Sequence, residues 1–226
     1  MNTYQFPRFS INYREETNDL DIIRSAYPQY SKLCKDIARD DIVIDAGAHI
    51  GIFTLLAMIN KPEKIYAYEI VKENYLLLKD NVGKSKKVKT INKGIAKKEG
   101  DYDLYPTQGK GTAGSNIYIT KKRSEPIQVE CVSAKSLFEL KPTVLKLDCE
   151  GAEYDVIDAI PKRNRLRIIF VEWHFKLQWR EFEKTKDDYA RNLDKLLSMG
   201  FTPKKIPLHP DSIGKKFVTM NTFYRR

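Results

Sequence analysis

Short apolar runs rich in β-branched residues alternate along the chain with segments whose apolar residues recur every three or four positions. The short runs predict buried strands of a parallel sheet, and the others predict helices packed on it. The predicted strands span residues 42–44, 64–69, 88–91, 101–105, 127–132, 143–147, 167–171 and 217–224. The predicted helices span residues 51–59, 72–82, 133–140, 154–160 and 187–199. This alternation predicts an α/β fold, a mostly parallel sheet with helices on both faces.

The first forty residues differ from the rest of the chain in their pattern of apolar and polar positions. Residues 1–40 have mixed polarity, with a rough helical pattern over 19–38 that Pro28 interrupts, and they predict an N-terminal helical extension. Residues 41–226 predict a single globular unit, since 226 residues suit one large domain. A segment with three glycines, residues 107–115, predicts a loop between two strands.

The length of the apolar stretches and the spacing of the cysteines indicate in which cellular compartment the protein works. The longest nearly uninterrupted apolar stretch, residues 50–59, is too short to cross a bilayer. The first ten residues have no basic-then-apolar arrangement, so no secretory signal is predicted. The three cysteines form no Cys-x-x-Cys pair, which favours reduced thiols. We therefore expect a cytoplasmic protein without a membrane span.

A glycine turn follows the first buried strand and opens a helix, with the sequence Asp-Ala-Gly-Ala-His-Ile-Gly at 45–51. Glu69 ends the next strand, where an acidic residue commonly holds ribose hydroxyls. Two cofactor classes suit this arrangement, dinucleotides and S-adenosylmethionine. The glycine spacing is not that of the dinucleotide fingerprint, and Asp45 would repel a pyrophosphate but attract a sulfonium or ammonium. S-adenosylmethionine is therefore favoured over a dinucleotide and over a turn without a ligand.

Three motifs together resemble the FkbM-type methyltransferases. They are Asp-Ala-Gly-Ala-His-Ile-Gly-Ile-Phe-Thr at 45–54, Leu-Lys-Leu-Asp-Cys-Glu-Gly-Ala-Glu at 145–153, and Phe-Val-Glu-Trp-His at 170–174. The resemblance covers about residues 41–175. It implies a Rossmann-like class I methyltransferase fold with a seven-stranded, mostly parallel sheet whose last strand is antiparallel. It also implies S-adenosylmethionine-dependent O-methylation of a hydroxyl on a sugar, a polysaccharide or a natural product.

The resemblance also implies a set of cofactor-binding residues. The turn would line the methionine part, the acidic residue would hold the ribose, and the segment after the third strand would border the adenine. This set consists of Asp45, Gly47, Ala48, His49, Gly51, Glu69 and Asn92. His49 has two readings, since it either contacts the cofactor or fills space in the turn.

The acceptor chemistry is expected at the carboxyl ends of the later strands, because ligands bind there in such sheets. A hydroxyl is a poor nucleophile and benefits from a general base. Asp148 is predicted to contact the acceptor or the methionine amine, so it also counts as cofactor-binding, and His174 is the best base by intrinsic pKa. Glu150 and Glu172 are further catalytic candidates. Glu150 is instead a helix-capping carboxylate in the alternative reading, as is Glu153.

Two alternatives at this edge concern a metal and an aromatic residue. Asp148, Glu172 and His174 could together bind a divalent ion, but their spacing is not diagnostic and no metal is favoured. Trp173 would stack on a sugar or, because side chains alternate along a strand, belong to the core. Phe175 and Trp179 are further aromatic candidates.

The net charge of +10 favours phosphate-rich partners such as nucleotide-linked sugars or nucleic acid. From the family resemblance, a sugar, glycan or nucleotide-linked sugar is the favoured acceptor, and the protein is expected to belong to a larger glycan-building polypeptide or complex. The alternative is an RNA methyltransferase acting on tRNA or rRNA, suggested by basic segments at 84–89, 121–123 and 225–226. No recognised RNA-binding module is present. A non-catalytic binding module is a third reading, disfavoured because the acidic residues of the motifs are retained.

Overall fold

The structure is a computed structural model. It describes residues 1–107, 113–115, 117–118, 125–174, 183–204 and 218–225. Most of the glycine-rich loop, the aromatic residues Phe175 and Trp179, and the basic segment 121–123 lie outside the described residues.

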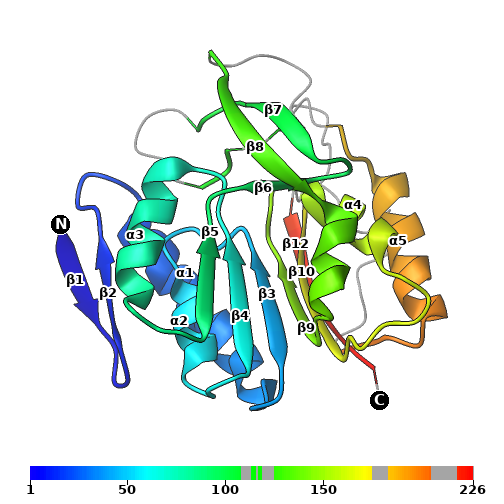
Figure 1. Cartoon of the computed structure of the whole chain (residues 1–226), viewed down its shortest axis with the longest axis horizontal. Coiled ribbons are helices and arrows are strands. Elements are labelled where there is room, and N and C mark those ends of the chain that lie inside the picture. Colours follow the sequence, from blue (N-terminus) through cyan, green and yellow to red (C-terminus); the bar gives the residue numbers. More distant parts are fainter. Residues whose placement is uncertain (108–112, 116, 119–124, 175–182, 205–217, 226) are drawn as a thin grey trace.

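The centre of the fold is a seven-stranded sheet (Figure 1). Its strand order is β11-β12-β10-β9-β3-β4-β5. The strands are β11 (Thr202–Pro203), β12 (Val218–Tyr224), β10 (Ile168–His174), β9 (Val144–Leu147), β3 (Ile42–Ala46), β4 (Lys64–Tyr68) and β5 (Val88–Ile91). β12 runs antiparallel to both β10 and β11, and all other paired strands of this sheet are parallel. The predicted sheet with a reversed last strand is confirmed.

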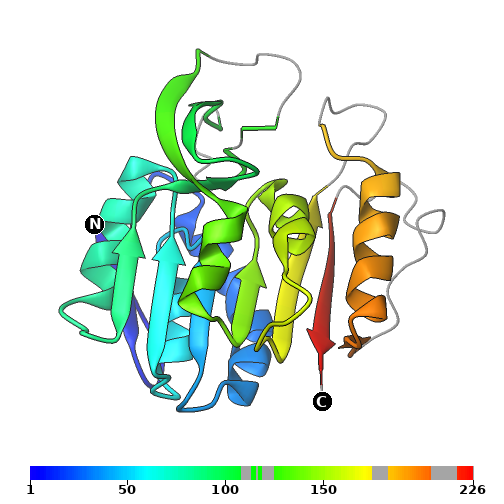
Figure 2. The same ribbon diagram turned by 45° about the vertical axis from the view of Figure 1, so that its right-hand side comes forward.

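Helices cover both faces of this sheet, as Figure 2 shows. One face carries α1 (Asp19–Leu33), α2 (Ile52–Met58) and α3 (Lys72–Val82). The other carries the 3₁₀-helix η2 (Ala134–Leu140), α4 (Ala152–Ala159) and α5 (Lys186–Ser198). Alternation along β3 divides the two cores, because Val43 packs with the first group of helices and Ile44 with the second.

A smaller three-stranded sheet lies above the edge where the parallel strands end (Figures 1 and 2). Its order is β6-β8-β7, with β6 parallel and β7 antiparallel to β8. The strands are β6 (Gly94–Ala96), β8 (Ile127–Ser133) and β7 (Gly100–Leu104). Ser133 also caps η2, where its Oγ accepts a hydrogen bond from the Lys135 amide.

The N-terminal forty residues are only partly helical. A hairpin of β1 (Asn2–Gln5) and β2 (Ser10–Tyr13) precedes α1, and the 3₁₀-helix η1 (Cys34–Asp36) follows it. Pro28 lies inside α1 instead of breaking it. Packing on both sides holds the helix together, because Tyr27 stacks on Phe6 and Tyr30 meets Phe53 edge-on. This packing offsets the usual cost of an interior proline.

Among the described residues, none forms a helix long and apolar enough to pass through a membrane.

Candidate active site

A cavity of about 270 Å³ opens at the carboxyl edge of the parallel strands. Its walls are formed by the turns after β3, β4 and β9, one face of α1, residues near β6, and residues 113–115, 117 and 118. Seven of the predicted site residues line it: Gly47, Ala48, His49, Glu69, Asp148, Glu150 and Glu172. Sequence motifs separated by about a hundred residues therefore meet around one space.

Gly47 allows the first turn to approach the end of β9. Its backbone has a φ of +76°, and an added Cβ would lie 1.7 Å from the Asp148 carbonyl oxygen. Only glycine combines this left-handed conformation with so close an approach. The amides of Gly47 and Ala48 donate to the Tyr68 carbonyl, which ties the turn to β4.

Glu69 is 5% exposed and lies at the end of β4. Its Oε2 accepts a 2.8 Å hydrogen bond from the His49 amide, and its Oε1 accepts one of 3.0 Å from the Val71 amide. The side-chain amide of Asn74 lies 3.4 Å from the same Oε1. Burial raises the pKa of Glu69 despite these bonds. The carboxyl group is thus held in one orientation at the cavity wall.

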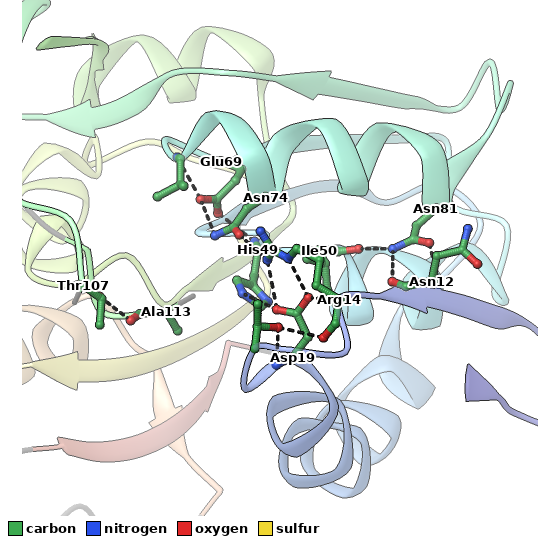
Figure 3. Close-up of polar contacts among 12 residues, drawn as sticks. Asn12, Arg14, Asp19, His49, Ile50, Glu69, Asn74, Asn81, Thr107 and Ala113 are labelled. Carbon is green, nitrogen blue, oxygen red and sulfur yellow. Dashed lines mark hydrogen bonds and ion pairs between the residues drawn. The ribbon is translucent and has the colours of Figure 1, made fainter. Parts of the chain in front are cut away.

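His49 sits in the turn with a φ of +51° and lines the cavity. Its Nε2 lies 3.7 Å from Oδ1 of Asp19, the first residue of α1. Burial lowers the pKa of His49 to about 4 despite that carboxylate, so the ring is neutral at pH 7. Arg14 forks onto Asp19 and also reaches Asn74, as Figure 3 shows.

Asp45 is not among the described residues that line the cavity. Its side chain is fully buried, accepts a 2.6 Å hydrogen bond from Thr54, and lies 3.2 Å from the Lys146 ammonium. The sequence places Asp45 against the cofactor, whereas strand alternation turns it toward α2 and β9. The carboxyl groups that do face the cavity come from other positions.

Lys146 is a buried cation inside β9 that also lines the cavity. Its Nζ donates to the Gly47 carbonyl at 2.6 Å and lies 3.7 Å from Asp148 Oδ2. Burial alone would lower the pKa of Lys146, but the carboxylates of Asp45 and Asp148 raise it to about 12. Lys146 therefore stays charged and joins the glycine turn to the end of β9.

Asp148 follows β9 with its side chain 25% exposed. Its Oδ2 accepts a 2.9 Å hydrogen bond from the Tyr30 hydroxyl. Burial alone would raise the pKa of Asp148, but the charges of Lys146 and His174 lower it below its usual value. Asp148 is therefore a carboxylate at neutral pH.

The pKa of Glu172 is shifted in the opposite direction from that of Asp148. Burial and the nearby Asp148 carboxylate raise the pKa of Glu172 to about 8. One side-chain ligand atom from each of Asp148, Glu172 and His174 lies within 4.8 Å of the others. The predicted proximity of this trio is therefore observed, and its chemistry would allow a divalent ion.

His174 is buried and is not among the described residues lining the cavity. Its Nδ1 lies 3.1 Å from Glu153 Oε1, and its Nε2 lies 3.6 Å from Glu150 Oε1. Burial opposes protonation, but Glu150 and Glu153 raise the pKa of His174 well above its usual value. An imidazolium cannot accept a proton, so this geometry does not favour His174 as a general base.

Glu153 matches its capping interpretation. It is fully buried at the start of α4, and its Oε2 accepts a 2.8 Å hydrogen bond from the Gly151 amide. Glu150 takes a left-handed conformation in the same turn and faces the cavity.

Three other predicted residues support the site from outside the cavity. Asn92 donates to the Glu69 and Ile70 carbonyls, and so fixes the turn after β4. Gly51 begins α2 with a φ of +102°. Trp173 is fully buried and donates to Asn221, which matches its interpretation as a core residue.

Sequence reasoning missed Lys146, Tyr30 and Arg14. A lysine inside an otherwise apolar strand was a usable signal for Lys146, since lysine is almost never fully buried unless paired. Tyr30 and Arg14 had no local signal for a role at the site, because the residues that connect them to it, Asp148 and Asn74, lie 118 and 60 residues away.

This sheet order, the glycine turn and the acidic edge together define a Rossmann-like methyltransferase fold. The model of the methyltransferase FkbM domain matches residues 45–203, which is more than half of the chain. The chain therefore belongs to the FkbM methyltransferase family, and it is an S-adenosylmethionine-dependent methyltransferase. No curated protein matches it.

Solved structures agree with this fold at low sequence identity. YhhF of Escherichia coli, described as a methyltransferase, aligns with a TM-score of 0.52 and 11% identity, covering 100% of this chain and 99% of that one. A protein of Clostridium thermocellum described as an rRNA methylase aligns with a TM-score of 0.51 and 9% identity, covering 87% and 93%. The tRNA m1G37 methyltransferase of M. jannaschii aligns with a TM-score of 0.51 and 12% identity, covering 99% and 56%.

Proposed function

We propose that this methyltransferase transfers a methyl group to a hydroxyl of a sugar, a glycan or a nucleotide-linked sugar. One observation carries the proposal, the pair of carboxyl groups Asp148 and Glu172 that both line the cavity with oxygens within 4.8 Å of each other. A hydroxyl must lose its proton as its oxygen is methylated, so a neighbouring proton acceptor is useful. A cytoplasmic location and a role in building a glycan are part of the same proposal.

The lining residues fit S-adenosylmethionine by their chemistry. Glu69 can accept hydrogen bonds from ribose hydroxyls, and Asp148 can accept them from an ammonium group. Ile70 and Ile95 supply apolar surface for an adenine ring near β6. Gly47, Ala48 and His49 form the turn that would lie along the methionine part. When bound, S-adenosylmethionine supplies a methyl group already activated by the sulfonium charge.

The chain itself then has two tasks at the acceptor. Asp148, held by Tyr30 and Lys146, orients the hydroxyl toward the donor. Glu172, in its carboxylate form, would accept the hydroxyl proton, and the acceptor oxygen would take the methyl group as the bond between that group and the donor sulfur breaks. A base with a pKa of about 8 is well matched to this task near neutral pH.

The positions of the basic segments favour a small polar acceptor over RNA. Lys87 lies before β5, at the opposite edge of the sheet from the cavity, and its ammonium is bound by the carbonyls of Lys61 and Pro62. Arg225 follows β12 and is bound by Asn164. These two described basic residues are thus directed away from the cavity or bound within the fold, whereas residues 121–123 lie outside the described part of the chain.

Transfer of a labelled methyl group tests the proposal. Purified protein with labelled S-adenosylmethionine is offered glycans, nucleotide-linked sugars and total RNA, and the products are digested with glycosidases or nucleases. We expect label in carbohydrate and a large loss of transfer in Asp148→Asn and Glu172→Gln. Glu139→Gln, on the exposed side of η2, is the matched control and should keep activity. Label released by nuclease alone would refute the carbohydrate acceptor.

A further inference from the structure

Arg14 lies in the segment between β2 and α1, outside the residues 45–203 that match the family model. Its Nε and Nη2 donate to the two oxygens of Asp19 at 2.8 and 2.9 Å. The same Nη2 donates to Asn74 Oδ1 at 2.6 Å. Asp19 is fully buried and Asn74 is 2% exposed, whereas the Arg14 side chain is 27% exposed. Arg14 is thus the outer member of a desolvated polar cluster.

The arginine determines how the Asn74 amide is oriented. A guanidinium has only donors, so it must face the oxygen of the amide. The nitrogen of that amide is then directed toward Glu69, and it lies 3.4 Å from Glu69 Oε1. Rotation of the amide by 180° would place two donors against each other and two acceptors against each other.

A second connection reaches the same carboxyl group through the glycine turn. Asp19 Oδ1 lies 3.7 Å from the His49 ring, and the His49 amide donates to Glu69 Oε2 at 2.8 Å. Two routes that begin at Arg14 therefore end at the two oxygens of Glu69 (Figure 3). Both His49 and Glu69 line the cavity, while Arg14 does not.

We propose that Arg14 is a positioning residue for the cofactor: through Asn74 and Asp19 it orients Glu69 and His49 toward the ribose of S-adenosylmethionine. This proposal rests on the assignment of Glu69 to the ribose made above. The segment before α1 then contributes to cofactor binding as well as to packing. Substitution of Arg14 should weaken binding of the cofactor and should affect the rate of methyl transfer less.

A similar pair elsewhere in the fold separates positioning from simple stabilisation. Arg167 forks onto the buried Asp41 at the opposite edge of the sheet, before β10 and β3 begin. Neither residue lines the cavity. Arg167→Ala therefore removes a comparable arginine–aspartate pair, which makes it the matched control for Arg14→Ala.

Calorimetric binding of S-adenosylmethionine, without any acceptor, measures the effect directly. Because a lost hydrogen bond to a charged group is at stake, we expect Arg14→Ala to raise the Kd about tenfold. Arg14→Lys should recover only part of the affinity, since an ammonium cannot fork onto two partners. Arg167→Ala should lower the melting temperature and leave the Kd unchanged. Equal Kd values for parent and Arg14→Ala would overturn the proposal.

Asn74→Asp serves if Arg14→Ala does not fold, because it keeps the partner of Arg14 but replaces the donor facing Glu69 with an acceptor. We expect a weaker Kd for this variant, and an unchanged one would contradict the proposal. A double-mutant cycle with Glu69→Gln adds a second criterion. Arg14→Ala should have little further effect in that background, and fully additive losses would show that Arg14 does not act through Glu69.

The same experiment separates the two proposals. Tight binding in the parent with no effect of Arg14 or Asn74 variants refutes only the positioning role. Binding that depends on Arg14 with no methyl transfer to carbohydrate refutes only the acceptor assignment.

Discussion

The Tyr30 hydroxyl donates a 2.9 Å hydrogen bond to Asp148 Oδ2, which joins α1 to the end of β9. Tyr30 is 6% exposed and lies between the rings of Phe53 and Phe170, so its position is fixed by packing. Its hydroxyl is the neutral partner of Asp148, while Lys146 is the charged one. Two elements that lie far apart in the sequence thus set the orientation of one carboxylate.

Tyr30→Phe should therefore reduce methyl transfer with little loss of stability. The ring keeps its packing, but Asp148 loses a hydrogen bond that lowers its pKa. Loss of one bond to a charged group corresponds to about 2 kcal/mol, or roughly thirtyfold in kcat/KM. Steady-state kinetics measure this loss of transfer, and thermal unfolding measures the stability. Tyr27→Phe in the same helix is the control, and an effect of equal size there would exclude a specific role for Tyr30.

The pH dependence of transfer should reflect Glu172. Its pKa of about 8 means that the carboxylate, the form able to accept a proton, increases as the pH rises through 8. Activity should rise over the same range and then level off. Because the folded protein holds this proton more tightly than the unfolded chain, Glu172 also makes stability fall between about pH 4.5 and 8.

Glu172→Gln tests both consequences. It should abolish the rise of kcat near pH 8 and reduce the loss of thermal stability between pH 5 and 8. A rise of the same shape in the variant would assign this titration to another group.

Gly47→Ala should be far more damaging than Gly83→Ala. Both glycines have positive φ values, +76° and +59°, but only at Gly47 would a new Cβ meet the Asp148 carbonyl, at 1.7 Å. The left-handed backbone alone costs about 1 kcal/mol, and displacement of packed backbone adds about 3 kcal/mol. Urea unfolding should therefore separate the two variants, and similar losses would argue against the close approach of β3 and β9.

Lys146→Met should destabilise the fold, because Asp45 and Asp148 would lose their shared cation. Removing one partner of a buried ion pair costs about 4 kcal/mol. Arg191→Met is the comparison, since its pair with Asp188 lies on the surface and should contribute less than about 1 kcal/mol. Denaturant unfolding of both variants provides the measurement. A loss at Lys146 no greater than that at Arg191 would contradict the buried bridge.

The sequence predicts the centre of the main sheet well because β3, β9 and β10 are largely apolar runs whose residues are buried on both faces. β6 and β11 escape prediction, since three and two residues are too few for any periodic signal. The cavity residues Gly47, Glu69 and Asp148 also follow from their positions after strands. The sequence pattern does not determine the direction in which a charged side chain points. The contact between Asp45 and Lys146 could therefore not be predicted from it.

The protonation state of each candidate base depends on the side chains packed around it. The ordinary pKa of histidine makes His174 attractive as a base, but Glu150 and Glu153 hold a proton on it. Burial and the Asp148 carboxylate raise the pKa of Glu172, so this acidic residue can act as a base near neutral pH. Neither shift can be read from residue type, because both depend on which side chains the fold brings together.

Helix α1 reaches the site at two points, because Asp19 at its first residue contacts the cavity residue His49 and Tyr30 in its last turns lines the cavity itself. These residues are eleven positions apart, or about 16 Å along the axis. A substitution that tilts this helix would therefore displace residues on the ribose side and on the hydroxyl side of the cavity at the same time.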